Sequence, residues 1–390
     1  MALLSALSLL LCPLASAQDA PRLRTIMGNE AIILVETLPK AKYVSVQLFA
    51  SNRYLEDEQT VHGYRHLLEH LLLKGKNKDI DIRLEKQGIW LMGRTLRDAI
   101  QIEFTCAPDQ VDVSLSALKE LLQPIQVSSA DIKAEVETMR QELALQTDAQ
   151  KLSSAAWEAA YGPEGLDPWG SIDSLSSATP EALAEIQKIL FSPKSLVLVI
   201  SGPVDIESNT SKAKKLLEDL RDETHNPKKA RGPGTHGRSE IESAFGEARG
   251  ARVGGYRDMK TACGLAAGLG LASSLDNAFV TYTPTGQNGL IIIGRTDENG
   301  GVGTKIDEMS DADAAGLFTT GKLLAERWVD RQLANPSDSA FFRGLLLTQG
   351  ASYRPEQLLE NIRAMDWKQF LTGVALFRKE NADIAVGVRH

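Results

Sequence analysis

The sequence predicts an α+β fold in which one unit of strands and helices is followed by a shorter, related copy. Its 390 residues are enough for two domains with sizeable cores. Apolar and polar residues alternate near the N-terminus as they do in strands, and later segments show the spacing of helices. A helix followed by a strand then recurs near the C-terminus. These three observations together favour two related domains.

The expected strands and helices follow one another in a definite order. Alternation with a period of two predicts strands, and apolar residues three and four apart predict helices. Thr179 and Pro180 are typical of a helix start, as cap and first-turn residue. We expect strands in 25–39 and 43–52, a histidine-bearing helix in 62–75, a short helix and two strands in 81–108, a helix in 111–125, one long helix from near Ser129 toward Tyr161, and a helix from Thr179 to Phe191 that feeds a buried strand in 195–201.

The first 17 residues are expected to be a cleavable signal peptide. An apolar run ends at Pro13, and Ala15-Ser16-Ala17 supplies the small residues of a cleavage site, although no Lys or Arg precedes the run. The alternative, a membrane anchor, would need a longer apolar run. We therefore expect an exported protein, periplasmic or secreted, with no membrane span.

A segment rich in Gly, Pro and charged residues divides the chain. We expect an N-terminal domain in 18–222, a linker in 223–245 and a C-terminal domain in 246–390. A helix before a strand ends at Phe191 in the first domain and at Phe377, 186 residues later, in the second. Two ordinary helix–strand units could match by chance, but a shortened repeat is the economical interpretation. The repeat has no histidine between His236 and His390, so we expect metal chemistry in the first domain alone.

Composition argues against a nucleic-acid-binding protein and against a disulfide-stabilised scaffold. A net charge of −8 and a pI of about 5.4 leave no basic surface for nucleic acid. Cys106 and Cys263 are the two cysteines that remain after the signal peptide. They are too few for a disulfide framework and are expected to be buried thiols.

The segment from His62 to Gly75, HGYRHLLEHLLLKG, carries the candidate chemistry. Because residues four apart share one face of a helix, His66 and His70 direct two imidazoles to one point, with Glu69 beside them. This H-x-x-E-H pattern suits Zn²⁺, and a nearby carboxylate can take a proton from water activated by the metal. His62 is better explained as a structural residue, since three positions on one straight helix do not converge on one ion. The alternative is a buried helix with incidental histidines.

A third ligand is expected from the helix that begins near Ser129. Glu135 and Glu142 are two turns apart and share a face beside its apolar residues, whereas Glu137 points elsewhere. Carboxylates at the margin of a buried face need a partner, and zinc is a suitable one.

HGYRHLLEHLLLKG followed by EVETMRQE resembles the pitrilysin/insulinase family of zinc peptidases. The resemblance implies that His66, His70 and Glu142 are the zinc ligands. It also implies that Glu69 is the general base and that Glu135 supports it in the catalytic set. For the fold, it implies two related α/β-sandwich domains, each an antiparallel-rich sheet packed with helices, with the second copy shortened.

The resemblance covers most of residues 25–205 and is weaker in the second half. Family members carry an arginine and a tyrosine seven residues apart that hold the substrate. Tyr282 matches the tyrosine and is the expected substrate-binding residue, but Leu275 stands at the arginine position. The edge strand that binds substrate often reads Asn-Ala in the family, and here it reads Met92-Gly93.

The expected function is a zinc metalloendopeptidase that hydrolyses peptides or unfolded polypeptide segments in a closed chamber. The resemblance implies that two chains close around this chamber, as a homodimer or as a heterodimer whose other subunit supplies the arginine and tyrosine. The alternative is a non-catalytic, metal-retaining subunit that binds peptides or serves as a scaffold in a peptidase complex. The sequence does not indicate the substrate or the cleavage preference.

Overall fold

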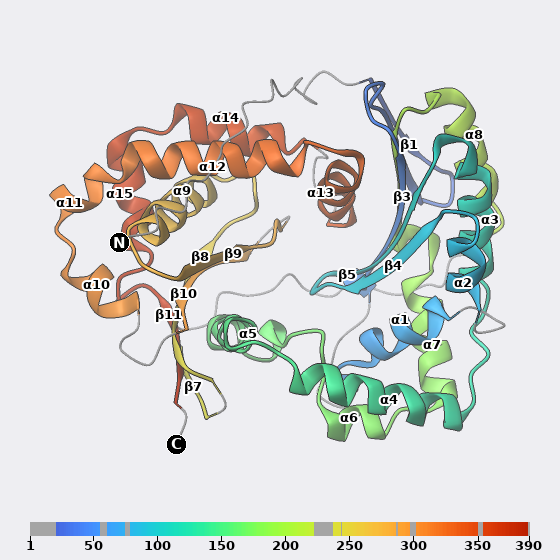
Figure 1. Ribbon diagram of the computed structural model, residues 1–390, viewed down its shortest axis with the longest axis horizontal. Helices are drawn as coiled ribbons and strands as arrows, with labels where there is room; N and C mark the ends of the chain where they lie inside the picture. The colour runs from blue at the N-terminus through green and yellow to red at the C-terminus, as the bar shows by residue number, and fades with distance from the viewer. Residues whose placement is uncertain are drawn as a thin grey trace, which may run out of the picture.

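The chain forms two mixed sheets that stand side by side, each covered by helices (Figure 1). A computed structural model describes residues 21–54, 61–74, 79–221, 237–242, 244–285, 288–296, 302–349 and 354–388. The predicted signal peptide lies outside these ranges. Within them, no helix has the length and apolar character needed to cross a membrane.

The described part of the first sheet has the strand order β1-β2-β6-β3-β5-β4, in which β4 is an edge. Strands β2 and β6 run parallel, and the other neighbours run antiparallel. Their bounds are Arg22–Ile26 (β1), Ile32–Thr37 (β2), Val44–Ser51 (β3), Trp90–Thr95 (β4), Ala99–Cys106 (β5) and Leu196–Gly202 (β6).

Helices from the first half of the chain contribute apolar side chains to a core on one face of this sheet. Most of them follow the expected apolar spacing, which gives each helix one buried stripe. They are α1 (Tyr64–Leu73), α2 (Ile80–Glu85), α3 (Val111–Leu121), α4 (Ser129–Ala144), α6 (Ile172–Ser176), α7 (Pro180–Leu190) and α8 (Ile206–Leu217).

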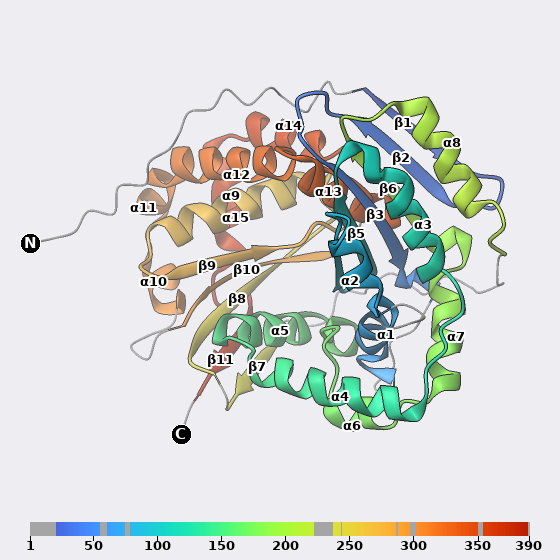
Figure 2. The same ribbon diagram turned by 45° about the vertical axis from the view of Figure 1, so that its right-hand side comes forward.

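The second sheet has the described strand order β7-β11-β8-β10-β9. Its strands are Arg238–Ile241 (β7), Gly246–Val253 (β8), Ala278–Tyr282 (β9), Gly289–Arg295 (β10) and Asp383–Gly387 (β11). Its core is completed by α9 (Met259–Ser273), α10 (Val302–Glu308), α11 (Asp311–Gly316), α12 (Phe318–Gln332), α13 (Pro336–Thr348), α14 (Glu356–Ala364) and α15 (Trp367–Ala375). Figure 2 shows α9, α12 and α14 lying above β9 and β10.

The strands of the two sheets pair in the same order and with the same directions, which confirms the predicted α+β architecture with a shortened second copy. Strand β6 lies between parallel β2 and antiparallel β3, and β11 lies between parallel β7 and antiparallel β8. Strand β5 then pairs antiparallel with β3 and β4, as β10 does with β8 and β9. Strand β1 has no counterpart among the described strands of the second sheet.

Each domain lends one helix to the sheet of the other (Figure 1). Helix α5 (Asp148–Tyr161) comes from the first half, yet its apolar side chains pack against β8, β10 and β11. Helix α13 comes from the second half and packs its Ala340, Leu345 and Leu347 against β2, β3 and β6. This exchange joins the two domains through their cores.

A buried polar cluster fixes α13 on the first sheet. The Glu36 carboxylate on β2 is fully buried and accepts hydrogen bonds from Ser201 Oγ (2.8 Å), Ser339 Oγ (2.7 Å) and Arg343 Nε (3.1 Å). The Arg343 guanidinium, also fully buried, donates to Glu356 at 2.8 Å. Arg22 on β1 pairs with the same two carboxylates, at 3.1 Å from Glu36 and 3.4 Å from Glu356, so two cations and two carboxylates balance in charge in this cluster.

Two details differ from or add to the sequence expectations. The long helix expected from Ser129 is two helices, α4 and α5, because Thr147 caps a new helix through a reciprocal pair of hydrogen bonds with Gln150. Residues 222–236 and 243, most of the predicted linker, lie outside the described residues, while β7 lies inside its range and pairs with β11. Cys106 and Cys263 are buried free thiols, as expected.

Candidate metal centre

Helix α1 is held deep in the first domain by its leucines. Leu67, Leu68 and Leu71 are at most 5% exposed and pack into the core. The helix starts after Gly63, whose φ of 90° favours glycine. A Cβ on Gly63 would lie 2.6 Å from the Gly170 Cα, so only a residue without a side chain permits this close backbone contact.

Two imidazoles and one carboxylate meet beside α1. The Nε2 atoms of His66 and His70 lie 3.2 Å apart. Helix α4 brings Glu142 to the same point, with its Oε2 at 3.6 Å from His66 Nε2 and 3.5 Å from His70 Nε2. The three predicted ligands thus form a nearly equilateral triangle of donor atoms.

This triangle fits a zinc ion. Tetrahedral zinc with ligands at 2.0–2.1 Å has donor atoms about 3.3–3.4 Å apart, which matches the three separations. Two histidines and one glutamate are also the donor set of a class of catalytic zinc sites that leave a fourth position for water. The Glu142 side chain is 37% exposed, so solvent reaches this side of the triangle.

His66 has the protonation state that a metal-binding histidine needs. Its burial, and next the neighbouring His70, lower the pKa of His66 to about 4. The imidazole is therefore neutral at pH 7, and a neutral imidazole is the form that binds a metal.

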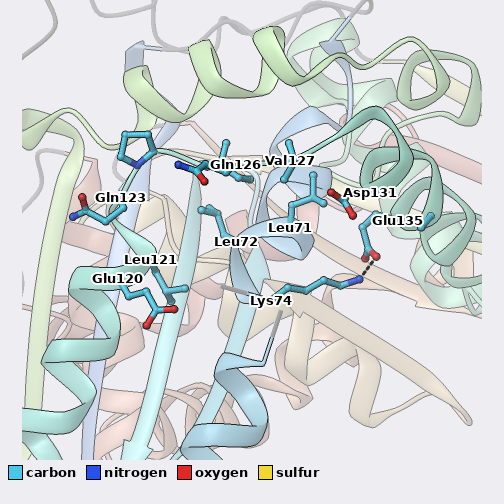
Figure 3. A pocket seen from close by; sticks show the side chains of 13 residues that line it. Leu71, Leu72, Lys74, Glu120, Leu121, Gln123, Gln126, Val127, Asp131 and Glu135 are labelled. Atoms are coloured by element: carbon cyan, nitrogen blue, oxygen red, sulfur yellow. Dashed lines mark hydrogen bonds and ion pairs between the residues drawn. The ribbon is translucent and has the colours of Figure 1, made fainter. Parts of the chain in front are cut away.

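Glu135 holds the far side of His70. One carboxylate oxygen lies 3.4 Å from His70 Nδ1, and the other pairs with Lys74, as Figure 3 shows. Glu135 is only 4% exposed, so Lys74 supplies the charge that compensates its burial. A proton on Nδ1 shared with Glu135 leaves the Nε2 lone pair directed at the triangle, an arrangement common around metal-bound histidines.

A pocket of about 460 Å³ lies beside this ion pair (Figure 3). Apolar residues of α1, α3, α4 and the α3–α4 connection form most of its wall. Glu135 lines it, but His66, His70 and Glu142 do not.

Glu69 faces the edge strand β4. Its carboxylate has an oxygen within 4.8 Å of donor atoms of both motif histidines, so it could itself approach a metal. Thr95 Oγ1 on β4 donates to Glu69 Oε2 at 3.2 Å. A Cβ on Gly93 would lie 2.3 Å from Glu69 Oε1, so this glycine makes room for the carboxylate.

Burial raises the pKa of the Glu69 carboxyl to about 7, against smaller opposing effects of His70 and Thr95. A carboxyl that titrates near neutrality can both accept and return a proton at physiological pH.

His62 and Trp169 form a wall that the motif alone does not indicate. His62 Nε2 lies 2.6 Å from the Asp167 carbonyl oxygen, so His62 holds the segment before Trp169. The Trp169 ring stands edge-on to His66 with 5.2 Å between ring centroids. Sequence reasoning gave Trp169 and Thr95 no role because both reach the site from separate segments and neither belongs to a periodic pattern.

Tyr282 is not brought to this site. It lies in the core of the second domain, with its ring 5.5 Å from that of Trp328. Its hydroxyl is buried and has no hydrogen-bond partner among the described residues, and burial raises its pKa. Leu275 belongs to the same core.

Comparisons with known proteins agree with the motif and the fold. Residues 32–166 match a family model described as insulinase, peptidase family M16. An uncharacterized zinc protease of Mycobacterium leprae is 25% identical over 199 residues, which cover 49% of this chain and 44% of that protein. The chain thus spans less than half the length of this curated relative.

Solved structures show the same fold over nearly the whole chain. A protease from Helicobacter pylori superposes with a TM-score of 0.79 at 16% identity, over 95% of this chain and 99% of that one. The periplasmic protease PqqL from Escherichia coli superposes with a TM-score of 0.70 at 14% identity, over 96% of this chain and 48% of that one. The family model over residues 32–166, the curated relative and the fold all support a peptidase of the pitrilysin/insulinase family.

Proposed function

We propose that this protein is a zinc metalloendopeptidase with His66, His70 and Glu142 as ligands and Glu69 as general base. The donor triangle, with edges of 3.2, 3.5 and 3.6 Å, carries the proposal, because it has the size and donor chemistry of a catalytic zinc site. The name of the Mycobacterium leprae relative supports zinc as the metal.

The side chains divide the work of hydrolysis among them. Zinc, when bound, would lower the pKa of a coordinated water and polarise the scissile carbonyl. Glu69 takes the proton of the attacking water and then gives it to the leaving amine, and a pKa near 7 suits both steps. Thr95 and Gly93 fix the position of the Glu69 carboxylate. Glu135 acts as a positioning residue, because its contact is with the ring nitrogen of His70 that points away from the triangle.

The peptide substrate would pair with the exposed edge of β4. This strand ends the first sheet, and its Gly93 and Thr95 lie against Glu69, so a peptide added there would pass beside the general base. Added strands gain main-chain hydrogen bonds with little dependence on sequence, which suits the cleavage of unfolded segments.

Assembly and location form part of the same proposal. A chamber would need a second unit, because this chain covers only 48% of PqqL, which joins further residues in one polypeptide. We propose that two chains, identical or related, close around the substrate. The 17-residue leader pattern and the periplasmic description of PqqL support export to the periplasm or beyond.

A second candidate function is a peptide-binding or scaffold subunit that keeps metal without cleaving. The buried position of Tyr282 favours it, because the residue expected to hold the substrate lies in the core of the second domain, together with Leu275 at the arginine position. If a partner subunit supplied the arginine and the tyrosine, the peptidase function would again be favoured.

Glu69→Gln separates the two functions, since it removes the base and leaves the donor triangle. We expect about one zinc per chain in both wild type and variant, and cleavage of an unstructured peptide by the wild type alone. The assay uses the purified chain by itself and with its co-purified partners. Equal cleavage by both proteins would contradict the role of Glu69, and no cleavage by any wild-type preparation would favour the scaffold.

A further inference from the structure

The edge strand β4 presents different side chains to its two faces. Alternation along a strand places Gly93 and Thr95 on one face, where they contact Glu69. Trp90 and Arg94 therefore lie on the opposite face, the one that α13 covers further along the sheet. The Arg94 guanidinium confirms this orientation, because it lies over the ring of Phe341 on α13, 5.3 Å from its centroid.

The β4 end of this face is exposed. The apolar residues of α13 pack on β2, β3 and β6, and its Phe341 lies against the Arg94 guanidinium. Trp90 is 59% exposed, and the Arg94 side chain is 46% exposed. A large apolar ring and a cation thus stand four residues apart on one exposed face of the edge strand.

The charge of Arg94 is only loosely compensated. Its one ion pair among the described residues joins it to Glu103 at 3.9 Å. Glu103 is 2% exposed and already accepts hydrogen bonds from Ser45 Oγ at 3.0 Å and Gln101 Nε2 at 3.3 Å. Most of the five guanidinium N–H groups of Arg94 remain available to a carboxylate from outside.

We propose that Arg94 is a specificity-determining residue that selects an acidic side chain in the peptide paired with β4. This inference rests on the proposed function, in which a peptide extends the first sheet. In such a peptide alternate side chains point to the Glu69 face and to the Arg94 face. A glutamate or aspartate opposite Arg94 meets the exposed guanidinium, and an apolar residue four positions away meets Trp90.

The test measures binding without cleavage. A fluorescent, unstructured peptide rich in Gln carries a single Glu that is moved along its length, and anisotropy reports its affinity for the zinc-loaded Glu69→Gln protein. At favourable positions Glu should strengthen binding about two- to fivefold over Gln, as expected for a half-exposed ion pair. Arg94→Gln should remove this preference, and Arg94→Glu should transfer it to a peptide with Lys at the same position.

Arg83→Gln is the matched control, because the Arg83 side chain is 45% exposed and its ion pairs join it to Asp79 and to Glu120 on α3. It should leave the preference unchanged. Equal affinity for Glu and Gln at every position, absence of binding, or a preference that survives Arg94→Gln would overturn the proposal. Cleavage by the wild type is measured separately, so a protein that prefers Glu without cleaving would contradict the peptidase function and retain the role of Arg94.

Discussion

Glu135→Gln tests how this protein prepares His70 for a metal. The substitution keeps the shape of the side chain and an acceptor oxygen but removes the negative charge between His70 Nδ1 and Lys74. Lys74 is then left without its carboxylate beside the imidazole, and its positive charge disfavours a nearby cation. We expect weaker zinc binding with an unchanged fold.

The magnitude follows from the contacts of Glu135. Residues that hold the outer nitrogen of a metal-bound histidine change metal affinity about 10- to 100-fold when substituted. This corresponds to about 1.4–2.7 kcal/mol of binding free energy. Since Glu135 is 4% exposed, solvent screens its charge little, and the effect should persist at moderate salt.

Competition with a chromophoric chelator measures the zinc affinity. Glu137→Gln is the matched control on the same helix, because Glu137 is 61% exposed and pairs with Arg140 at the surface. Its affinity should equal that of the wild type. If Glu135→Gln binds zinc as tightly as Glu137→Gln, the carboxylate does not position His70 and the reasoning is refuted.

Three further changes test other parts of the structure. Gly93→Val brings a side chain larger than the alanine common at this position in the family against Glu69 Oε1, which lies 2.3 Å from the Cβ position, and should lower peptidase activity about 100-fold at unchanged zinc content. Gly28→Val, with no atom within 4 Å, should not, and equal activities would contradict the packing argument. Arg343→Met removes a fully buried cation and leaves two buried carboxylates with Arg22 alone, so it should destabilise the fold by about 3–5 kcal/mol in urea unfolding. The exposed Arg83→Met should cost less than about 1 kcal/mol. Folding raises the pKa of Glu69 from 4.5 to about 7, so the folded state binds more protons than the unfolded state between these pH values. The metal-free wild type should therefore lose stability as the pH rises from 4.5 to 7. The melting temperature of Glu69→Gln should not show this fall with pH. If the melting temperatures of the wild type and of Glu69→Gln depended on pH in the same way, Glu69 would not be buried in its uncharged form.

Local patterns predicted which side chains meet at the centre of the candidate site. The spacing of His66 and His70 on one helix makes their meeting a matter of helix geometry. The seven-residue spacing of Glu135 and Glu142 places both on one face of α4, and the structure brings each to a histidine. The assignment of Glu142, and not Glu135, to the donor triangle depended on the family resemblance. Helix geometry alone does not distinguish the two glutamates.

Other features depend on contacts between distant segments. An apolar stripe predicts that α5 and α13 are buried, but not that each packs on the sheet of the other domain. The break before α5 was visible in principle, since Thr147 and Gln150 have the spacing of a capping box, but helical periodicity on both sides concealed it. The Lys74–Glu135 pair joins positions 61 residues apart, and no local pattern reports such a pairing.

Anomalous diffraction at the zinc absorption edge tests the central claim most directly, on crystals of the chain grown with zinc and without chelators. We expect one strong peak, from a zinc ion bonded to Nε2 of His66, Nε2 of His70 and a carboxylate oxygen of Glu142. A peak elsewhere, or a zinc ion at the histidines with Glu142 turned away from it, would contradict the account.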